Sequence, residues 1–260
     1  MITSSKYSML YPALVERIYT EESRKAGKNY EKAVKTCLHQ MFGAYVQGNA
    51  HKKAVSLLQE LEAGKDAKEV SGKVLTLHAS TKERLPHLEA FCEFVTMHTG
   101  PVESIMDLGC GFNPFSVPYW TEYKLRAYYA YDIDMRTKDL LNRFFAYIKL
   151  PVFAACADLA IETPVEKVDL SLMCKLVPVL EAQAHGRGFE LARQQNAKFL
   201  VITYPLKSLG GKEKGMGKNY AAQFDKALAD GALGGYIPVE FMEIGSELVY
   251  VLTSDRGVVG

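Results

Sequence analysis

At residues 107–114 the chain reads Asp107-Leu108-Gly109-Cys110-Gly111-Phe112-Asn113-Pro114. An apolar run comes directly before it, and Asn113 followed by Pro114 is a typical start of a helix. Glycines at a strand-to-helix turn let the backbone approach a ligand at the carboxyl end of the strand. The spacing D-x-G-x-G lacks the third glycine of the dinucleotide fingerprint, and S-adenosylmethionine has no pyrophosphate to hold. The stretch therefore predicts a turn that binds S-adenosylmethionine, with an ordinary βα turn as the alternative.

The sequence after Gly100-Pro101 predicts an α/β fold. Five short apolar runs alternate with amphipathic stretches, as in βα units around a parallel sheet; they are residues 103–108, 127–133, 151–155, 168–173 and 199–204. Two further runs, residues 239–244 and 248–253, are separated by Gly245-Ser246 and predict an antiparallel hairpin. Five alternating units closed by a hairpin are the layout of the Rossmann-like class I S-adenosylmethionine methyltransferases.

The first hundred residues lack strand-like alternation and read as helices. Apolar residues recur at helical spacing in four segments, which are residues 12–18, 33–45, 54–61 and 88–95. Pro12 suits a first helical turn, Gly64 is a candidate end of the third helix, and Pro86 leaves the start of the fourth open. We place a boundary near Gly100. It divides the chain into a helical domain of residues 1–100 and a methyltransferase domain of residues 101–260.

The composition excludes several classes of protein. With 48% apolar residues the chain can bury a full core, and its 31 basic and 30 acidic residues leave RNA binding to local clusters of charge. No apolar stretch approaches the roughly 18 residues of a membrane span, and the first residues do not form a signal peptide. The five cysteines are widely spread, with no CxxC. We therefore expect reduced thiols, a cytoplasmic protein and no structural zinc.

Acidic residues follow the second and third predicted strands. Asp132 ends the second strand, where a carboxylate can accept two hydrogen bonds from a ribose diol. Asp134, two positions further along the chain, is a competing candidate; its alternative role is a solvated loop acid. Asp158 closes the third strand and is expected to reach the adenine edge, with a helix N-cap as the alternative. A glycine turn followed by acids at two successive strand ends favours a cofactor site.

The fourth predicted strand ends at Cys174 and Lys175, where we expect the border of the methyl group. Lys175 is a candidate cofactor-binding residue; it could also contact RNA phosphate or orient the backbone, and a surface lysine is the alternative. Cys174 is a candidate nucleophile for covalent catalysis. Because no partnering Pro-Cys element is present, a buried inert thiol is the preferred interpretation.

Two basic segments are candidates for RNA contact. The segment of residues 204–220 contains four lysines against one glutamate, including Lys207, Lys212 and Lys214, and leaves the fifth strand on the side of the cofactor. Contacts from such a loop to phosphate supply affinity and set the register on RNA. A second basic run in the amino-terminal helices consists of Arg24, Lys25, Lys28, Lys32 and Lys35. For both segments the alternative is a solvated surface.

The chain resembles the 16S rRNA (guanine-N7) methyltransferases that confer aminoglycoside resistance, the Arm/Rmt/Kgm group, which modify guanosine 1405. The resemblance runs nearly end to end. It rests on blocks that include Leu38-His39 with Gly43 and Tyr45, residues 78–84 (HASTKER), 107–114, 131–134, 175–181, 204–220 and 244–250. Departures are few: Phe115 and Cys174 stand where aliphatic residues are expected, and Met216-Gly217-Lys218 varies on the pattern Met-Glu-x.

The resemblance implies roles for the site residues. Arg84 would hold the cofactor carboxylate, Gly109 and Gly111 would face the methionine moiety, Asp132 would bind the ribose, and Asp158 would lie by the adenine. The helical amino-terminal region would dock on RNA. We expect the cofactor S-adenosylmethionine, a monomeric enzyme, and as substrate helix 44 of 16S rRNA in the 30S subunit.

Guanine N7 carries a lone pair and no proton, so methyl transfer to it needs no general base and we assign no catalytic acid or base. The enzyme has to position N7 and exclude water. The paired guanine has to leave its stack, and Phe112 and Tyr204 are candidates to stack against it. The main alternative is the neighbouring adenine-N1 methyltransferase group, which clamps its base between tryptophans, whereas this chain has one tryptophan, Trp120. A catalytically inactive RNA-binding protein and a small-molecule methyltransferase are further alternatives.

Overall fold

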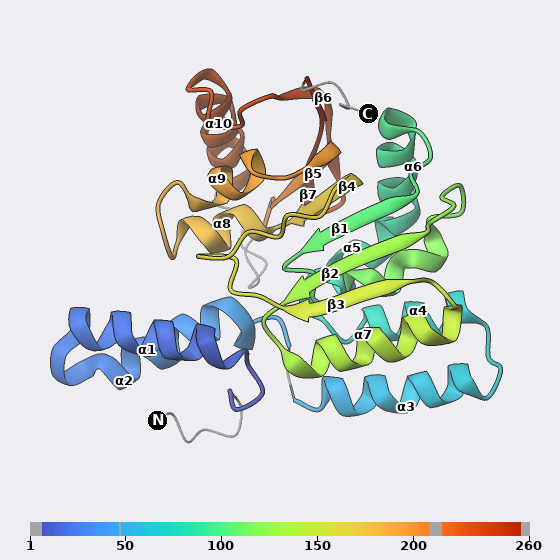
Figure 1. The fold of residues 1–260 in the computed structure, drawn as a ribbon, viewed down its shortest axis with the longest axis horizontal. Helices are drawn as coiled ribbons and strands as arrows, with labels where there is room; N and C mark the ends of the chain where they lie inside the picture. The colour runs from blue at the N-terminus through green and yellow to red at the C-terminus, as the bar shows by residue number, and fades with distance from the viewer. Residues whose placement is uncertain (1–6, 47, 208–214, 256–260) are drawn as a thin grey trace.

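The computed structural model describes residues 7–46, 48–207 and 215–255, and Figure 1 shows its arrangement around one sheet. The seven strands are ordered β3-β2-β1-β4-β5-β7-β6. Their bounds are β1 Ser104–Leu108, β2 Ala127–Asp132, β3 Val152–Cys156, β4 Val168–Cys174, β5 Ala197–Pro205, β6 Tyr236–Ile244 and β7 Glu247–Ser254. The first five are parallel, and β7 pairs antiparallel with both β5 and β6. The α/β class, the five parallel strands and the terminal hairpin are confirmed.

The strand order places a ligand crevice at the end of β1. The chain goes from β1 to β2 and β3 on one side of β1, and β4 and β5 then lie on its other side. Ligands of open parallel sheets bind where the order reverses, beyond the carboxyl ends of the strands. The glycine turn at Gly109 follows β1 directly, so this turn lies at the switch point.

Both faces of the sheet are covered by helices, as the alternation of the strand residues requires. Ile105 lies in an apolar core with one set of helices, and Met106 lies in the core on the opposite face. The first core includes residues of α3 Ala50–Glu62, α4 Ala67–Leu75, α6 Leu88–Thr99 and α7 Met135–Ile148. The second includes residues of α8 Leu176–Glu181, α9 Arg187–Arg193 and α10 Met216–Ala229. Strands buried on both faces read as continuous apolar runs, which is how they appear in the sequence.

A third apolar core belongs to the amino-terminal helices alone. It is built from α1 Pro12–Ala26, α2 Tyr30–Leu38 and the π-helical turn η2 His39–Gly43, and it ends at Ala50. In Figure 1 this unit lies at the lower left, beyond the arrowheads of β2 and β3. It is joined to the segment that leads from β2 into α7 by backbone hydrogen bonds from Tyr11 N to Ile133 O (2.7 Å) and from Met135 N to Met9 O (3.0 Å). The apolar packing therefore changes near residue 50, whereas the helices of residues 50–99 share the core of the sheet.

Three local expectations need correction. Helix α2 ends at Leu38 and passes into the π-helical turn, so the expected single helix over residues 33–45 is divided. Asn113 does not cap a helix, because the 3-10 helix η4 Asn113–Tyr119 follows Phe112 and the Asn113 side chain contacts Asp107 and Arg84 instead. Helices α4 and α5 Ala79–Arg84 were not predicted. Within the described residues, no helix is long and apolar enough to span a membrane.

Candidate functional site

The turn after β1 requires glycine at two positions. Gly109 and Gly111 have φ angles of 64° and 50°, a region that L side chains rarely adopt. A Cβ atom would also lie 2.8 Å from Leu176 Cδ1 at Gly109 and 2.8 Å from His78 Nε2 at Gly111. The backbone of this turn therefore lines the cavity closely, with no room for side chains.

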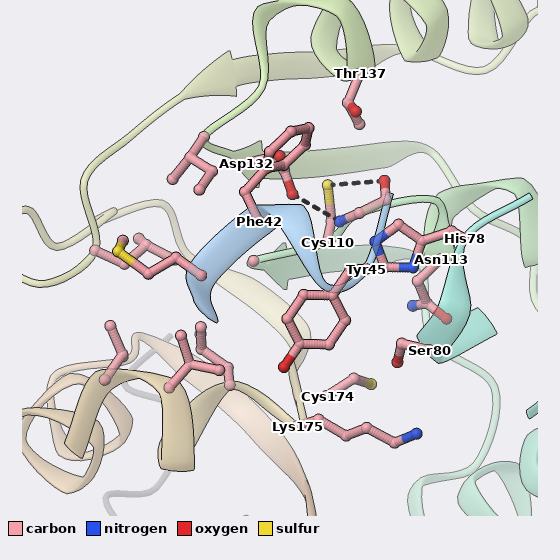
Figure 2. Close-up of a pocket in the computed structure, with 18 of the residues that line it drawn as sticks. Phe42, Tyr45, His78, Ser80, Cys110, Asn113, Asp132, Thr137, Cys174 and Lys175 are labelled. Carbon is pink, nitrogen blue, oxygen red and sulfur yellow. Dashed lines mark hydrogen bonds between the residues drawn. The ribbon is translucent and has the colours of Figure 1, made fainter. Parts of the chain in front are cut away.

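One cavity at this turn is lined by all six residues that the sequence predicts to bind the cofactor. It is enclosed by the glycine turn, by the ends of β2 and β4, and by the amino-terminal unit, which contributes Phe42 and Tyr45 (Figure 2). The six residues are Arg84, Gly109, Gly111, Asp132, Asp158 and Lys175. We call it the cofactor cavity. The structure thus brings the predicted set together, while the individual roles stay predictions.

The two acids after β2 differ in their surroundings. Asp132 lies in the cofactor cavity and accepts hydrogen bonds from the backbone N–H of Gly111 (2.8 Å) and of Asp134 (2.9 Å). Burial raises the pKa of Asp132 to about 6, against these hydrogen bonds, which lower it. Asp132 is therefore the acid of this pair that can accept bonds from a bound ligand.

Asp134 is a buried structural residue, so the alternative of a solvated loop acid is wrong. It caps α7, accepting from Arg136 N at 2.9 Å, and pairs with Arg136 Nη2 (2.9 Å) and His51 Nε2 (3.1 Å). Burial alone would raise the pKa of Asp134, but the hydrogen bonds from His51 and Arg136 hold it below its ordinary value. Its carboxylate is fully occupied by these partners.

Arg84 is the centre of a buried network beneath the cofactor cavity. Its Nε and Nη2 donate to both carboxylate oxygens of Glu247 (2.9 and 2.7 Å), and Nη1 donates to Asn113 Oδ1 (2.7 Å). Asn113 in turn donates to Asp107 Oδ2 (2.8 Å), as does the hydroxyl of Tyr128 (2.8 Å). Burial raises the pKa of Asp107 to about 7. Sequence reasoning missed Glu247, although it stands in a block quoted for the family resemblance.

Lys175 is buried, so the alternative of a surface lysine is wrong. It has a left-handed backbone (φ 55°, ψ 18°), and its Nζ lies 2.8 Å from Glu83 Oε2 and 3.5 Å from Glu247 Oε1. Burial raises the pKa of the neighbouring Cys174 thiol to about 12. A thiol with this pKa is protonated at neutral pH and is a poor nucleophile, which agrees with the preferred interpretation of Cys174.

Asp158 connects the cofactor cavity to the amino-terminal unit. Arg17 of α1 donates from Nε and Nη2 to the two carboxylate oxygens of Asp158, the second bond at 3.0 Å, and also to Gln183 Oε1 at 2.9 Å. The Asp158 side chain is almost completely buried, and the residue precedes a turn of residues 159–161 and no helix, so it is not a helix N-cap. Sequence reasoning missed Arg17, because nothing in a helical pattern shows which residue 141 positions away a side chain will meet.

The two proposed stacking residues are unavailable, and this expectation is wrong. Phe112 is fully buried and packs against His51, His78 and Phe115. Tyr204 is also fully buried and stacks on Tyr220 with ring centroids 5.1 Å apart. Neither ring can contact a base without repacking of the core.

A second cavity, of about 310 Å³, opens beside the cofactor cavity. The two cavities share Met41, Tyr45, Lys175, Val179 and Gln183. The remaining residues of the second cavity include Glu83, Pro205, Lys207 and Tyr220. We call it the base cavity, because it is the adjoining space from which a planar group could reach the cofactor cavity.

The predicted RNA-contacting residues are distributed over two regions. Arg24, Lys25 and Lys28 are exposed on α1 and the turn after it, and Lys25 lies 3.8 Å from Glu21 and Glu22. Lys28 also lines a shallow hollow together with Lys32, Lys35 and His39. Lys207 is exposed at the rim of the base cavity. Lys212 and Lys214 lie outside the described residues.

Three features define a class I S-adenosylmethionine-dependent methyltransferase. The parallel sheet has a glycine turn at its switch point, the next strand ends in an acid placed to bind a ribose, and the turn lacks the dinucleotide fingerprint. The residues present fit this cofactor. The glycine cradle would be filled by a Cβ atom, and Asp132 faces the same cavity. A family model described as ribosomal RNA methyltransferase (FmrO) matches residues 3–251, and the chain belongs to this family.

Known proteins of this family resemble the chain over nearly its whole length. The 16S rRNA (guanine(1405)-N(7))-methyltransferase of Serratia marcescens is 34% identical over 259 residues, which are 97% of this chain and 95% of that protein. The enzyme of the same name from Micromonospora rosea is 32% identical over 96% of this chain and 92% of its own length. The crystal structure of 16S rRNA methyltransferase RmtF in complex with S-adenosyl-L-homocysteine superposes with a TM-score of 0.86 at 32% identity, covering 97% of this chain and 95% of that one. The 16S rRNA methylase RmtB gives a TM-score of 0.82 at 28% identity, covering 98% and 95%.

Proposed function

We propose that the protein transfers a methyl group from S-adenosylmethionine to N7 of guanosine 1405, in helix 44 of 16S rRNA within the 30S subunit. It would act in the cytoplasm as a monomer and give resistance to aminoglycosides of the 4,6-disubstituted deoxystreptamine class. One observation carries the proposal: the six predicted cofactor residues line one cavity, and a second cavity opens beside it through shared residues. The family membership supports the choice of ribosomal RNA as substrate.

The residues present suit a reaction that needs no general base. S-adenosylmethionine supplies an electrophilic methyl group when bound, and guanine N7 offers a lone pair without losing a proton. The chain then has to hold both partners in line and exclude water, which can supply much of the rate enhancement of such a transfer. Asp132 and the glycine turn would hold the cofactor. Cys174 would contribute packing alone, because its raised pKa keeps it protonated.

Tyr45 replaces Phe112 and Tyr204 as the residue proposed to stack on the guanine. Its ring lines both cavities, and it lies parallel to His78, with centroids 5.8 Å apart and an interplanar angle of 12°. A base that leaves a helix loses its stacking, and an aromatic ring at the destination restores part of it. The ring comes from the amino-terminal unit, so docking of this unit on RNA and placement of the base would be linked.

Docking would use the amino-terminal basic run and the segment of residues 204–220. Arg24, Lys25 and Lys28 are exposed on the amino-terminal unit, and Lys207 lies at the rim of the base cavity. Lysine and arginine contacts to phosphate set the register on RNA without reading its sequence. Shape recognition of a folded subunit by two such regions favours assembled 30S subunits over free 16S rRNA as substrate.

The proposal is tested by mapping the modified nucleotide. Purified 30S subunits are incubated with the protein and S-adenosylmethionine. Methylated positions are located by chemical cleavage at N7-methylguanosine and by reverse-transcription stops at N1-methyladenosine. We expect one new site, at position 1405, and far less modification of naked 16S rRNA. Modification at the neighbouring adenine, or at no position, would refute the proposed target, and equal modification of naked RNA would refute the proposed substrate.

A further inference from the structure

We infer that Glu83 and Lys175 together select guanine in the base cavity by pairing with its N1–H and O6. This inference rests on the proposed function and deepens it, because it names the residues that determine which base is accepted. Glu83 belongs to α5 and Lys175 follows β4, and both line the base cavity.

The two side chains form a fixed pair at the junction of the cavities. Lys175 Nζ lies 2.8 Å from Glu83 Oε2, and the Lys175 side chain is 6% exposed. Glu247 lies behind Lys175 at 3.5 Å, and the Lys175 backbone N–H donates to Thr203 O at 3.0 Å, so the lysine is anchored from below. The Glu83 side chain is 35% exposed, and within the described residues its Oε1 accepts no hydrogen bond.

The pair presents a donor beside an acceptor. Lys175 can donate from its ammonium group, and Glu83 can accept with its carboxylate. Guanine presents the complementary order, because the acceptor O6 is adjacent to the donor N1–H. Adenine presents the reverse order, since its N6 amino group donates and its N1 accepts. An adenine in this position would place its N6 donor against the Lys175 ammonium group and its N1 acceptor against the Glu83 carboxylate.

The same arrangement orients the reacting atom. In guanine, O6 lies on the same edge as N7. Lys175 lines both cavities, whereas Glu83 lines the base cavity alone. A guanine whose O6 contacts Lys175 and whose N1–H contacts Glu83 therefore turns its N7 edge toward the cofactor cavity. Selection of the base and alignment of N7 would follow from one ion pair.

The test uses the change Glu83→Gln, because glutamine offers one donor and one acceptor and so matches the N1/N6 edge of adenine. Single-turnover methylation is measured on 30S subunits with guanosine at the target position and on subunits with adenosine there. A site built to hydrogen-bond its substrate rejects a mismatched analogue by roughly 10⁴-fold. We expect the guanosine-to-adenosine rate ratio of the Glu83→Gln variant to fall at least about tenfold from that of the wild type. The exposed Glu89, which pairs with Lys68 at 2.7 Å, provides the control Glu89→Gln, whose ratio should not change.

The guanosine-to-adenosine rate ratio is taken within each variant. Partial loss of folded protein lowers both rates equally, so it does not change the ratio. A second variant, Glu83→Ala, removes the acceptor and should lower the rate on guanosine by about 100-fold while the affinity for S-adenosylmethionine stays within about twofold. An unchanged ratio in Glu83→Gln, or equal losses on both bases, overturns the inference and leaves Glu83 as a structural partner of Lys175. If the wild type modifies no guanosine at all, the proposed function itself is refuted, and the two failures are therefore distinct.

Discussion

At the scale of single residues, two acids two positions apart serve the fold and the site separately. Asp132 faces the cofactor cavity, whereas Asp134 is buried with His51 and Arg136. We expect Asp132→Asn to weaken S-adenosylmethionine binding about 10- to 100-fold with little loss of stability. We expect Asp134→Asn to lower the free energy of unfolding by about 1–3 kcal/mol with a smaller effect on binding. Calorimetry and urea unfolding of both variants check this. A larger loss of S-adenosylmethionine binding in Asp134→Asn than in Asp132→Asn would assign the ribose to Asp134.

His78 should make stability depend on pH. Burial, and then the positive charges of His51, Lys175 and Arg84, lower the pKa of His78 from 6.5 to about 3. Between these two values the unfolded chain binds a proton at His78 that the folded protein does not. The contribution of neutral His78 to the free energy of unfolding is therefore fully present above pH 6.5 and declines as the pH falls. We expect His78→Gln to be less stable than the wild type at pH 7. The difference in the free energy of unfolding between the wild type and the variant should narrow by about 2 kcal/mol from pH 7 to pH 5, as measured by urea unfolding. A gap that does not change with pH would contradict the buried neutral state.

The sequence located the residues that line the cofactor cavity better than it located their partners. Gly109, Gly111 and Asp132 were predictable because each follows a strand whose apolar run is visible, and parallel strands end at one edge. Two partners were not predictable, Glu247 for Arg84 and Arg17 for Asp158. These contacts join residues that are 163 and 141 positions apart in the sequence. Side-chain pairing across that distance depends on tertiary packing, and no local pattern encodes it.

At the scale of elements, the strands were predicted more completely than the helices. All seven strands match apolar runs; burial on both faces gives the central strands β4 and β5 an unbroken signal, whereas β6 is apolar although most of it is exposed. Helix α4 was missed although Asp66 caps it by accepting from Glu69 N, a pattern that the sequence displays as D-x-x-E. Helix α5 has six residues and too few apolar positions to show a period. The π-helical turn η2 interrupts an otherwise continuous apolar stripe, so periodicity alone could not locate it.

Helix α1 is attached to the cofactor cavity through Arg17 and Asp158. The Arg17 side chain is 13% exposed and that of Asp158 is 1% exposed, so removal of one partner leaves a charge in a poorly solvated place. We expect Arg17→Met alone to cost about 3 kcal/mol of unfolding free energy and the double change with Asp158→Asn to recover part of it. Urea unfolding of the two single variants and the double variant gives the coupling energy. Additive losses would mean that the pair contributes nothing beyond its separate residues.

At the scale of the whole molecule, the apolar cores and the expected domains divide the chain differently. The predicted boundary near Gly100 follows the change from helical to alternating patterns, which is a property of local sequence. The cores change near residue 50 instead, because α3, α4 and α6 contribute to the apolar core on one face of the sheet. We therefore propose that the docking unit consists of the helices before Ala50, and that the later helices belong to the methyltransferase core.

The basic segment of residues 204–220 should control binding to the subunit and leave the cofactor site unaffected. We expect the change of Lys207, Lys212 and Lys214 to glutamate to abolish resistance to kanamycin and gentamicin while cofactor affinity barely changes. The salt dependence of subunit binding should flatten by roughly one unit of slope for each lost phosphate contact. Single alanine changes should be milder, because affinity is spread over several contacts. Normal subunit binding by the triple variant would assign docking to the amino-terminal unit alone.

The pairing of Arg84 with Glu247 has a consequence for how the enzyme is made. A ribosome synthesises Arg84, Asp107 and Asn113 long before Glu247, and domains fold as their residues emerge. Until β7 has left the exit tunnel and inserted beside β5, the nascent chain holds a guanidinium without its carboxylate in what will become the wall of the cofactor cavity. We therefore expect a nascent chain of this kind to be inactive for most of its synthesis. It becomes competent to modify ribosomes only after the strand that carries Glu247 has been added to the sheet.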